Sequence, residues 1–391
     1  MEMEISYRGK QGNKGQHNNS MGIRGYDYVE FYVGSAKMVA YWHAKALGLD
    51  LVGYKGPETG VRDRCSFLMA APDNPNFKIV ITSALEPETY EIQEFVTRHG
   101  DGVKRWSVEV DSVEETYKKA LNNGAIPVTD PYKLEDENGF VEQAAIKVYA
   151  DVEINFINYD NYRGLFIPGF ENPRFNWPND RQETGLKGID HIVGNVNVNE
   201  MDRWANYINK SLDFETFIDF GPGDISTKYS ALLSKVVKSK DDLIKNPINE
   251  PYDGVKRSQI EEFIAEYNGP GIQHLALITS DIITTVRNMR ANGIEFLNTP
   301  PQTYYDAIAK KDFGLTEDIK TLQELGILID TEGKGYLLQL FTKPIGDRPT
   351  FFYEIIQRRK GATGFGQGNF QALFDSIETE QALRGNLDKP S

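Results

Sequence analysis

Three side chains in this sequence have the types and settings that a metal site requires. His191 and His274 each lie near the start of a segment that alternates like a strand, in IDHIVGNV and in HLALIT. Glu354 lies in TFFYEIIQR, an otherwise apolar segment where an unpaired carboxylate would be costly to bury. The sequence separation between His191 and His274 nearly equals that between His274 and Glu354, as expected for equivalent strands of a repeated fold. The three residues are therefore candidates for one shared metal site.

Two imidazoles and one carboxylate predict a particular metal chemistry. Such a set leaves three coordination positions open and is typical of non-haem Fe(II) oxygenases. A closed zinc site would need four protein ligands, usually with cysteine, and the single cysteine, Cys65, lies in the other half of the chain. Two alternatives stay open. A lone strand histidine is often structural, and Glu354 could instead form an ion pair with Arg348 or Arg358.

The other three histidines have settings that do not indicate a ligand. His17 lies in a polar segment, and His99 lies in a turn next to a glycine. His43 lies on an amphipathic helix, which favours a partly buried structural role.

An internal repeat relates the two halves of the chain. GYDYVEFYV at 25–33 resembles GIDHIVGNV at 188–196, and the segment at 102–124 resembles that at 271–293 with one gap. Each half therefore holds two strand–helix–strands units, which predicts an α+β architecture and not a parallel βαβ wheel. The repeat places Tyr28 opposite His191 and Arg105 opposite His274. Because neither replacement is a good metal ligand, we expect no catalytic metal in the N-terminal half.

Composition shifts along the chain predict its organisation. Residues 1–20 are polar and aperiodic, which indicates a flexible tail, and residues 161–185 are rich in Asn, Pro and Gly, as a linker is. We expect domains at 21–160 and 186–391, and a helix at about 368–385. The predicted strands are 26–33, 64–70, 77–83, 105–110, 142–148, 152–159, 189–196, 214–220, 227–234, 274–279, 326–330, 336–342 and 350–357. A Ser258/Glu261 capping box predicts the start of another helix.

Composition also excludes some functional classes. The chain has 391 residues with a formal net charge of −14, so it is a poor candidate for binding nucleic acid or an anionic membrane. One cysteine excludes an intrachain disulfide and fits a reducing compartment. We find no apolar run long enough to span a membrane and no secretory signal at the N-terminus. We therefore expect a soluble cytoplasmic protein.

From about residue 22 to 385 the chain resembles the 4-hydroxyphenylpyruvate dioxygenase family of the vicinal-oxygen-chelate, glyoxalase-like superfamily. The motifs that carry the resemblance are LKGIDHIVGNV, NPINEP, KRSQIEEF, GPGIQHLAL, PPQTYY, the run ELGILIDTEGKGYLLQLFTKPIGDRPTFFYEIIQR and GFGQGNFQALFDSIE. The resemblance implies tandem βαβββ modules in two half-barrel domains followed by the C-terminal helix. The N-terminal half matches more loosely, which fits a scaffolding role.

The resemblance also implies which residues form the site. The family's iron ligands fall on His191, His274 and Glu354, the three residues found above. Its polar pocket residues fall on Ser230, Asn249, Gln259, Gln273 and Gln339, its aromatic clamp falls on Phe341 and Phe370, and Phe352, Phe365 and Asn369 fall nearby. One Fe(II) per chain is implied, with 4-hydroxyphenylpyruvate and O2 as substrates. The products would be homogentisate and CO2, in tyrosine catabolism, and the chain would form a homodimer or homotetramer.

Three details of this assignment are open to test by the fold. Strict alternation turns Gln273 away from His274, so a bulge is needed if both line one pocket. Gln339 and Phe341 share one strand face. GFGQGNF at 364–370 places three glycines before the last helix, which predicts a hinged gate over the site, although an ordinary packed helix is the alternative.

Two other functions compete with this prediction. The first is 4-hydroxymandelate synthase, which would use the same iron and substrate but hydroxylate the benzylic carbon. The second is a non-catalytic binding module of the same superfold. Retention of all three candidate ligands argues against the second.

Overall fold

The structure is a computed structural model that describes residues 18–72, 74–178, 180–221, 231–252, 254–332 and 335–388. The side chains of Glu332, Phe370 and Gln371 lie outside this description. None of the described helices is long and apolar enough to cross a membrane.

Within the described residues, the N-terminal half forms one eight-stranded sheet in the order β2-β3-β4-β1-β5-β8-β7-β6. Its strands are β1 (Ile23–Tyr32), β2 (Asp50–Lys55), β3 (Arg64–Ala71), β4 (Asn74–Ala84), β5 (Gly102–Val110), β6 (Pro127–Asp136), β7 (Gly139–Val148) and β8 (Val152–Asn158). Its helices are α1 (Ala36–Ala46), the 3-10 helix η1 (Pro57–Thr59), α2 (Tyr90–His99) and α3 (Val113–Asn122).

The described part of the C-terminal half forms a second eight-stranded sheet in the equivalent order, β10-β11-β12-β9-β13-β16-β15-β14. Its strands are β9 (Leu186–Asn195), β10 (Glu215–Phe220), β11 (Ala231–Lys238), β12 (Lys245–Tyr252), β13 (Gly271–Thr279), β14 (Leu328–Glu332), β15 (Gly335–Phe341) and β16 (Phe352–Arg359). Its helices are α4 (Met201–Leu212), α5 (Gln259–Tyr267), α6 (Ile282–Ala291), α7 (Gln302–Ala309), α8 (Ile319–Leu325), the 3-10 helix η2 (Gln367–Asn369) and α9 (Phe370–Arg384).

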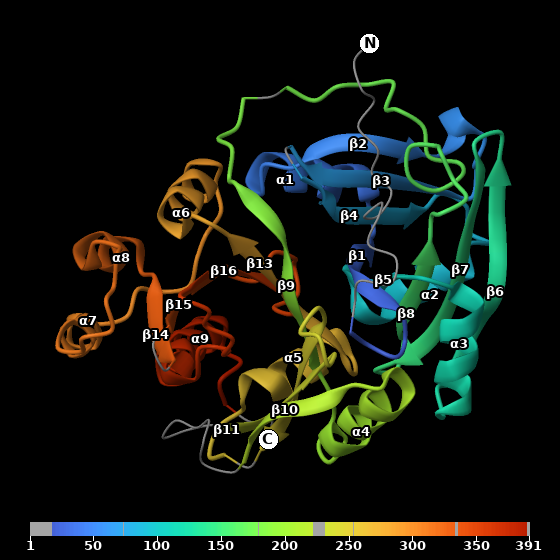
Figure 1. Ribbon diagram of the computed structural model, residues 1–391. Coiled ribbons are helices and arrows are strands. Elements are labelled where there is room, and N and C mark those ends of the chain that lie inside the picture. The colour runs from blue at the N-terminus through green and yellow to red at the C-terminus, as the bar shows by residue number, and fades with distance from the viewer. Residues whose placement is uncertain are drawn as a thin grey trace.

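Both sheets follow the same plan, and the predicted fold class is confirmed. The first strand of each unit pairs in parallel with the last, as β1 does with β4 and β13 does with β16. Two units join in each sheet through an antiparallel pair, β1 with β5 and β9 with β13. Figure 1 shows the two sheets side by side, the first in blue to green and the second in yellow-green to red. The molecule is thus an α+β protein of tandem βαβββ modules.

Several elements differ from those expected, and each difference has a local cause. Strand β6 is an exposed edge strand with the sequence PVTDPYKLED, so it shows no apolar alternation. Strand β12 contains Pro247 and Pro251, and two prolines so close together are more typical of a turn than of a strand. The strand tolerates them because its pairing with β9 is limited to Ile248 and Asn249. The predicted strand 227–234 begins in residues that lie outside the described part, and β11 starts at Ala231.

One expected turn is in fact helical. His99 is the last residue of helix α2, and its buried ring donates from Nδ1 to Tyr267 O at 2.7 Å while its Nε2 lies 3.0 Å from Asp151 Oδ2. Helix α2 has no side-chain cap on Thr89, so it lacks the capping signal that marks α5. The predicted capping box of Ser258 and Glu261 is confirmed.

The two halves share a continuous apolar core across their junction. Phe31 of β1 packs edge-on against Phe351, with ring centroids 5.0 Å apart. His43 of α1 is wholly buried there, and its Nε2 accepts from the Tyr353 hydroxyl at 2.8 Å while its Nδ1 donates to Val39 O. His43 is therefore structural, as expected, but more deeply buried than expected.

The stability of this junction should depend on pH through His43. Burial lowers the pKa of His43 to about 4 from an ordinary 6.5, so acid favours the unfolded chain, which binds the proton more tightly. Its contribution to stability is complete above the unfolded pKa and is lost as pH falls toward the folded one. We expect the unfolding free-energy difference between the wild type and His43→Gln to shrink by about 2 kcal/mol between about pH 7 and pH 5. Denaturant unfolding at both pH values measures it, and a constant difference would contradict the assignment.

Candidate active site

The three candidate ligands meet on neighbouring strands of the second sheet. Strands β9, β13 and β16 lie in that order, and Ala276 of β13 pairs in register with both His191 and Glu354. The small Ala276 side chain leaves space between them, and His274 stands two residues earlier on the same strand. Glu354 Oε2 lies 3.3 Å from His191 Nε2 and 3.3 Å from His274 Nε2. The sheet topology thus brings together residues that are far apart in the sequence.

A bulge precedes each histidine and turns a hydrogen-bonding partner toward it. Ile272 and His274 of β13 pair with Gly194 and Val193, which are consecutive on β9, so Gln273 is the extra, bulged residue. On β9 the same occurs at Asp190. His274 Nδ1 donates to Gln273 Oε1 at 3.1 Å, and His191 Nδ1 donates to Asp190 Oδ1 at 2.8 Å. Both rings therefore present Nε2 to the site, and the bulge expected at Gln273 is present.

Burial and mutual attraction set the charges of the three residues. Burial by itself would raise the pKa of Glu354, but His191 and His274 lower it to about 2, so the carboxylate is ionised. Burial opposes a charge on His191, yet Glu354 and Asp190 together raise its pKa. Burial lowers the pKa of His274. The alternative ion pairs of Glu354 are not formed, because Arg358 pairs with Asp190 and Arg348 donates to backbone carbonyls.

This donor set fits a metal ion. One ligand atom from each of His191, His274 and Glu354 lies within 4.8 Å of the others, and all three residues are buried. Among the described residues this is the group of His, Cys, Asp and Glu side chains with that property. Two nitrogens and one oxygen, with no thiolate, suit a first-row divalent metal that keeps open positions. The site can therefore hold a metal ion that keeps open coordination positions.

The ligands open into a small cavity of about 70 Å³. Six of the residues predicted for the pocket line it: Asn249, Gln259, Gln273, Phe341, Phe352 and Phe365. Phe352 stacks on the His274 ring at 4.8 Å between centroids, and Phe365 meets the His191 ring edge-on at 5.0 Å. These two aromatic residues thus hold the metal-ligand rings as well as forming the wall.

Four other predicted residues are placed differently or are not described. Gln339 is buried beside Gly366 and does not line the cavity. The two residues are so close that a Cβ atom at position 366 would collide with the Gln339 side-chain amide. Asn369 does not line it either, because its Oδ1 accepts from the Tyr304 hydroxyl at 2.7 Å and ties the start of α9 to α7. Ser230 and the Phe370 side chain lie outside the described residues.

The structure adds site residues that the sequence predictions missed. Ser234 lines the cavity and lies opposite Asn249 across β11 and β12, and Leu373 and Phe374 of α9 close the cavity from above. Asp190 also belongs to the site, since it joins His191 to Arg358. Asp190 was detectable as a second acidic residue within an apolar strand, by the reasoning applied to Glu354.

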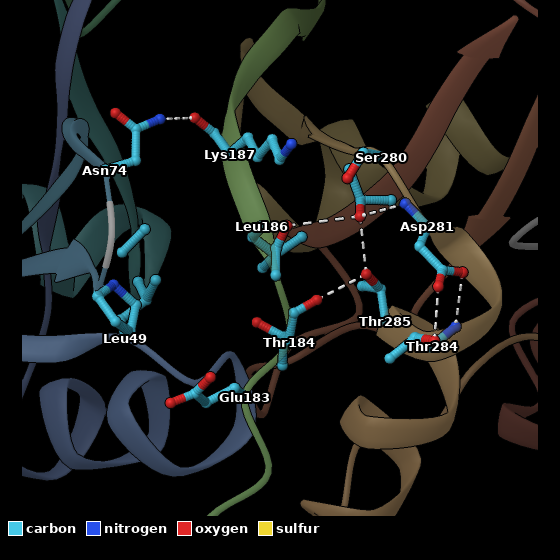
Figure 2. Close-up of a pocket in the computed structure, with 14 residues that line it drawn as sticks. Leu49, Asn74, Glu183, Thr184, Leu186, Lys187, Ser280, Asp281, Thr284 and Thr285 are labelled. Atoms are coloured by element: carbon cyan, nitrogen blue, oxygen red, sulfur yellow. Dashed lines mark hydrogen bonds between the residues drawn. The ribbon is translucent and has the colours of Figure 1, made fainter.

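The largest cavity described, about 420 Å³, lies elsewhere, between the two halves. Figure 2 shows its walls, where Thr184 and Leu186, which lie just before β9 and at its first residue, face Asp281 and Thr285 at the start of α6. Its threonine hydroxyl groups already have partners: Thr285 donates to the Thr184 carbonyl and bonds to the Thr279 hydroxyl, and Thr284 donates to Asp281. This cavity offers none of the candidate metal ligands.

Asp190 should control metal affinity through His191. We expect Asp190→Asn to weaken metal binding about 10- to 100-fold, because an outer-sphere carboxylate fixes the tautomer and raises the basicity of the ligand. The repeat supplies a matched control in Asp27, which is also buried and pairs with Lys78 and Tyr159 in the N-terminal half. Asp27→Asn should lose stability but keep metal affinity. Metal titration of both variants measures this, and equal affinities would disprove the role of Asp190.

Comparison with known proteins agrees with this geometry. A family model for the Glyoxalase/Bleomycin resistance protein/Dioxygenase superfamily matches residues 188–318. The 4-hydroxyphenylpyruvate dioxygenase of Aspergillus fumigatus is 43% identical over 394 residues, covering 93% of this chain and 94% of that protein. The same-named enzymes of Yarrowia lipolytica and Danio rerio are 44% and 43% identical, covering 95% and 93% of this chain and 95% and 92% of theirs.

Solved structures show the same relationship. A mutant of 4-hydroxymandelate synthase from Streptomyces coelicolor superposes with a TM-score of 0.78 at 27% identity, over 91% of this chain and 99% of that one. The sequence relatives share far more identity with this chain than this structural neighbour does. A two-histidine, one-glutamate site on paired βαβββ modules, together with these relatives over nearly the whole length, places the chain in the 4-hydroxyphenylpyruvate dioxygenase family.

Proposed function

We propose that this chain converts 4-hydroxyphenylpyruvate and O2 into homogentisate and CO2 by oxidative decarboxylation, ring hydroxylation and side-chain migration. The observation that carries the proposal is the buried His191, His274 and Glu354 cluster at the edge of an aromatic cavity. Nearly full-length relatives of that name support the choice of substrate.

We propose one Fe(II) per chain as the metal. When bound, the iron would supply two positions for chelation of an α-keto acid and one for O2. The protein's task is to hold three ligands on one side and to shield the rest from water. The buried Asp190 and Gln273 hydrogen bonds hold both imidazoles in the required tautomer.

The strand order suggests how the substrate lies. The ligands occupy β9, β13 and β16, while Ser234 and Asn249 stand on β11 and β12, beyond β9. A substrate with its keto acid at the ligands would point its phenol toward this polar pair, whose hydroxyl and amide groups can bind the phenol hydroxyl. Phe341 and Phe352 flank the ring from β15 and β16. Gln259 and Gln273 offer further amide groups along the wall.

We propose that α9 closes the site after the substrate enters. A cavity of about 70 Å³ is small for an arylpyruvate, and Leu373 and Phe374 of α9 form part of its wall. Gln339, whose side-chain oxygen and nitrogen are buried without a hydrogen-bond partner, lies under Gly366 at the start of this segment. Displacement of the segment would let the Gln339 side chain reach the cavity, as the predicted gate requires.

The second candidate, 4-hydroxymandelate synthase, is favoured by one observation, its structural likeness to this chain. It would share the metal, the ligands and the substrate, so product identity alone separates the two. A non-catalytic binding module would not need a fully buried set of three metal ligands.

The direct test is oxygen uptake by the purified chain with 4-hydroxyphenylpyruvate. We expect uptake that depends on added Fe(II) and is absent with Zn2+, which has no accessible redox change. Homogentisate should accumulate in proportion. Uptake that is independent of Fe(II), or accumulation of 4-hydroxymandelate, would contradict the proposal.

We further propose that the chain works as a homodimer or homotetramer in the cytoplasm, without nucleic-acid or membrane partners. The excess of 57 acidic over 43 basic residues and the single cysteine support this setting. Light scattering of the purified protein measures its mass in solution.

A further inference from the structure

The N-terminal sheet has a cavity at the place that corresponds to the metal site of the second sheet. Arg105 of β5 pairs in register with Glu153 of β8 as His274 pairs with Phe352, so Asn155 stands where Glu354 stands. Tyr28 stands at the position of His191, and bulges occur on β1 and β5 as they do on β9 and β13. The scaffold of a site is therefore retained here with a different set of side chains.

This second cavity measures about 150 Å³, larger than the cavity at the ligands. Its wall is mostly polar, but one side of it is aromatic, where Phe166 meets Phe170 edge-on with ring centroids 5.2 Å apart. A cavity of about 150 Å³ is the size that holds a single benzene ring. The space therefore suits a single-ring ligand.

The charged groups around this cavity balance in number, but one cation has no carboxylate in ion-pair contact. Arg105 is offset by Glu30 at 3.2 Å and Glu153 at 3.3 Å, and Arg64 pairs with Asp63 at 2.8 Å. Lys55 also lines the cavity, but within the described residues no carboxylate lies within 4 Å of its ammonium group. Its Nζ instead stands 5.9 Å from the centroid of the Phe170 ring. Lys55 is thus a half-buried cation beside an aromatic pair, and the carboxylates of Glu30 and Asp63 act on it only from beyond ion-pair distance.

Two hydrogen-bond donors accompany Lys55. Gln143 is 3% exposed, its Oε1 accepts from the Asn155 side-chain amide at 3.3 Å, and its own amide group lines the cavity. The Tyr132 hydroxyl also lines the cavity without a hydrogen bond in the described part of the chain. Hydrogen-bond donors beside a cation form the kind of environment that binds a carboxylate.

We propose that this cavity is a second ligand site, which takes a single-ring aromatic carboxylate. The carboxylate binds Lys55, with Gln143 and Tyr132 as donors, and the ring packs against Phe166 and Phe170. No metal takes part, since Tyr28, Arg105 and Asn155 replace the ligands of the other half. The site is independent of the proposed reaction, because it lies in the other sheet and shares no residue with the metal cluster.

The test is binding of 4-hydroxyphenylacetate to the metal-free full-length chain, followed by isothermal titration calorimetry. This probe has a ring and a carboxylate but no keto group. Lys55→Met keeps the length of the side chain and removes its charge, and Lys133→Met on the exposed strand β6 is the matched control. We expect Lys55→Met to weaken one binding event about 10- to 100-fold and Lys133→Met to leave it unchanged. The neutral analogue 4-hydroxybenzyl alcohol should bind wild type at least about 10-fold more weakly.

Three results would overturn the proposal. They are equal binding of the probe by wild type and Lys55→Met, equal binding of the acid and the alcohol, and crystals soaked with the probe that show no density beside Phe166. Thermal unfolding of Lys55→Met checks that the fold is intact. Because Lys55 lies outside the catalytic site, its variant should keep wild-type turnover, which separates this proposal from the catalytic one.

Discussion

His274→Ala should abolish turnover of 4-hydroxyphenylpyruvate, as should alanine at His191 or Glu354. Each residue supplies one of only three ligand atoms, so its loss changes both the affinity for metal and the geometry of the open positions. The loss of affinity should exceed the roughly 100-fold that removal of an outer-sphere partner costs. His274→Ala also leaves Glu354 buried with one partner fewer.

The measurements are iron content after anaerobic loading and oxygen uptake with substrate. Tyr28→Phe is the matched control, because Tyr28 holds the position of His191 in the other half and lies in the core of the first sheet. It should keep full iron content and activity. Near-normal activity of His274→Ala with iron bound would refute the ligand assignment.

Deleting the chain from Gly368 onward should uncouple decarboxylation from ring hydroxylation. The deletion removes Leu373 and Phe374, which seal the cavity, and so opens it to water. A keto acid could still be decarboxylated at the ligands, but the oxidising equivalents would be lost before they reach the ring. We expect the ratio of CO2 released to homogentisate formed to rise well above one.

A point variant keeps this prediction testable if the truncated chain is unstable. Helix α9 is tied to α5 by Arg384 and Glu262, so its removal also costs packing. Phe374→Ala should weaken binding of substrate, or of a flat diketone inhibitor, by about 1–3 kcal/mol while iron binding is retained, and the same range holds for Phe370→Ala. Leu383→Ala, on the exposed face of the same helix, is the control. Unchanged inhibitor affinity and an unchanged product ratio would show that α9 only packs against the site.

The grouping of His191, His274 and Glu354 could be predicted from the sequence because the repeat marks equivalent strands. A carboxylate within an apolar strand and two histidines at equivalent strand starts need no long-range information to be noticed. The alternation of apolar and polar residues along one strand could not predict the bulge, because a bulge is defined by the pairing of two strands. Gln273 therefore needed an assumption, and Asp190 was missed although it lies next to His191.

The wall of the cavity was harder to predict because distant segments build it. Ser234 lines it only because β11 pairs with β12 in a register that sets it opposite Asn249. Gln339 lies on the expected strand, but the loop at Gly366, which follows in the chain, covers its side chain. Helix α2 was missed while α5, its counterpart in the repeat, was found, since only α5 carries a capping box. Packing between elements, and not local pattern, decided these positions.

The central claim is that this site inserts both atoms of O2 into 4-hydroxyphenylpyruvate to give homogentisate. Its most direct test is a single incubation of the Fe(II)-loaded chain with substrate under 18O2, with mass spectrometry of the product. The account predicts homogentisate with one labelled oxygen in the new carboxylate and one in the new ring hydroxyl, and one CO2 per product. Formation of doubly labelled 4-hydroxymandelate would contradict it. So would the absence of any product from chain that has iron bound.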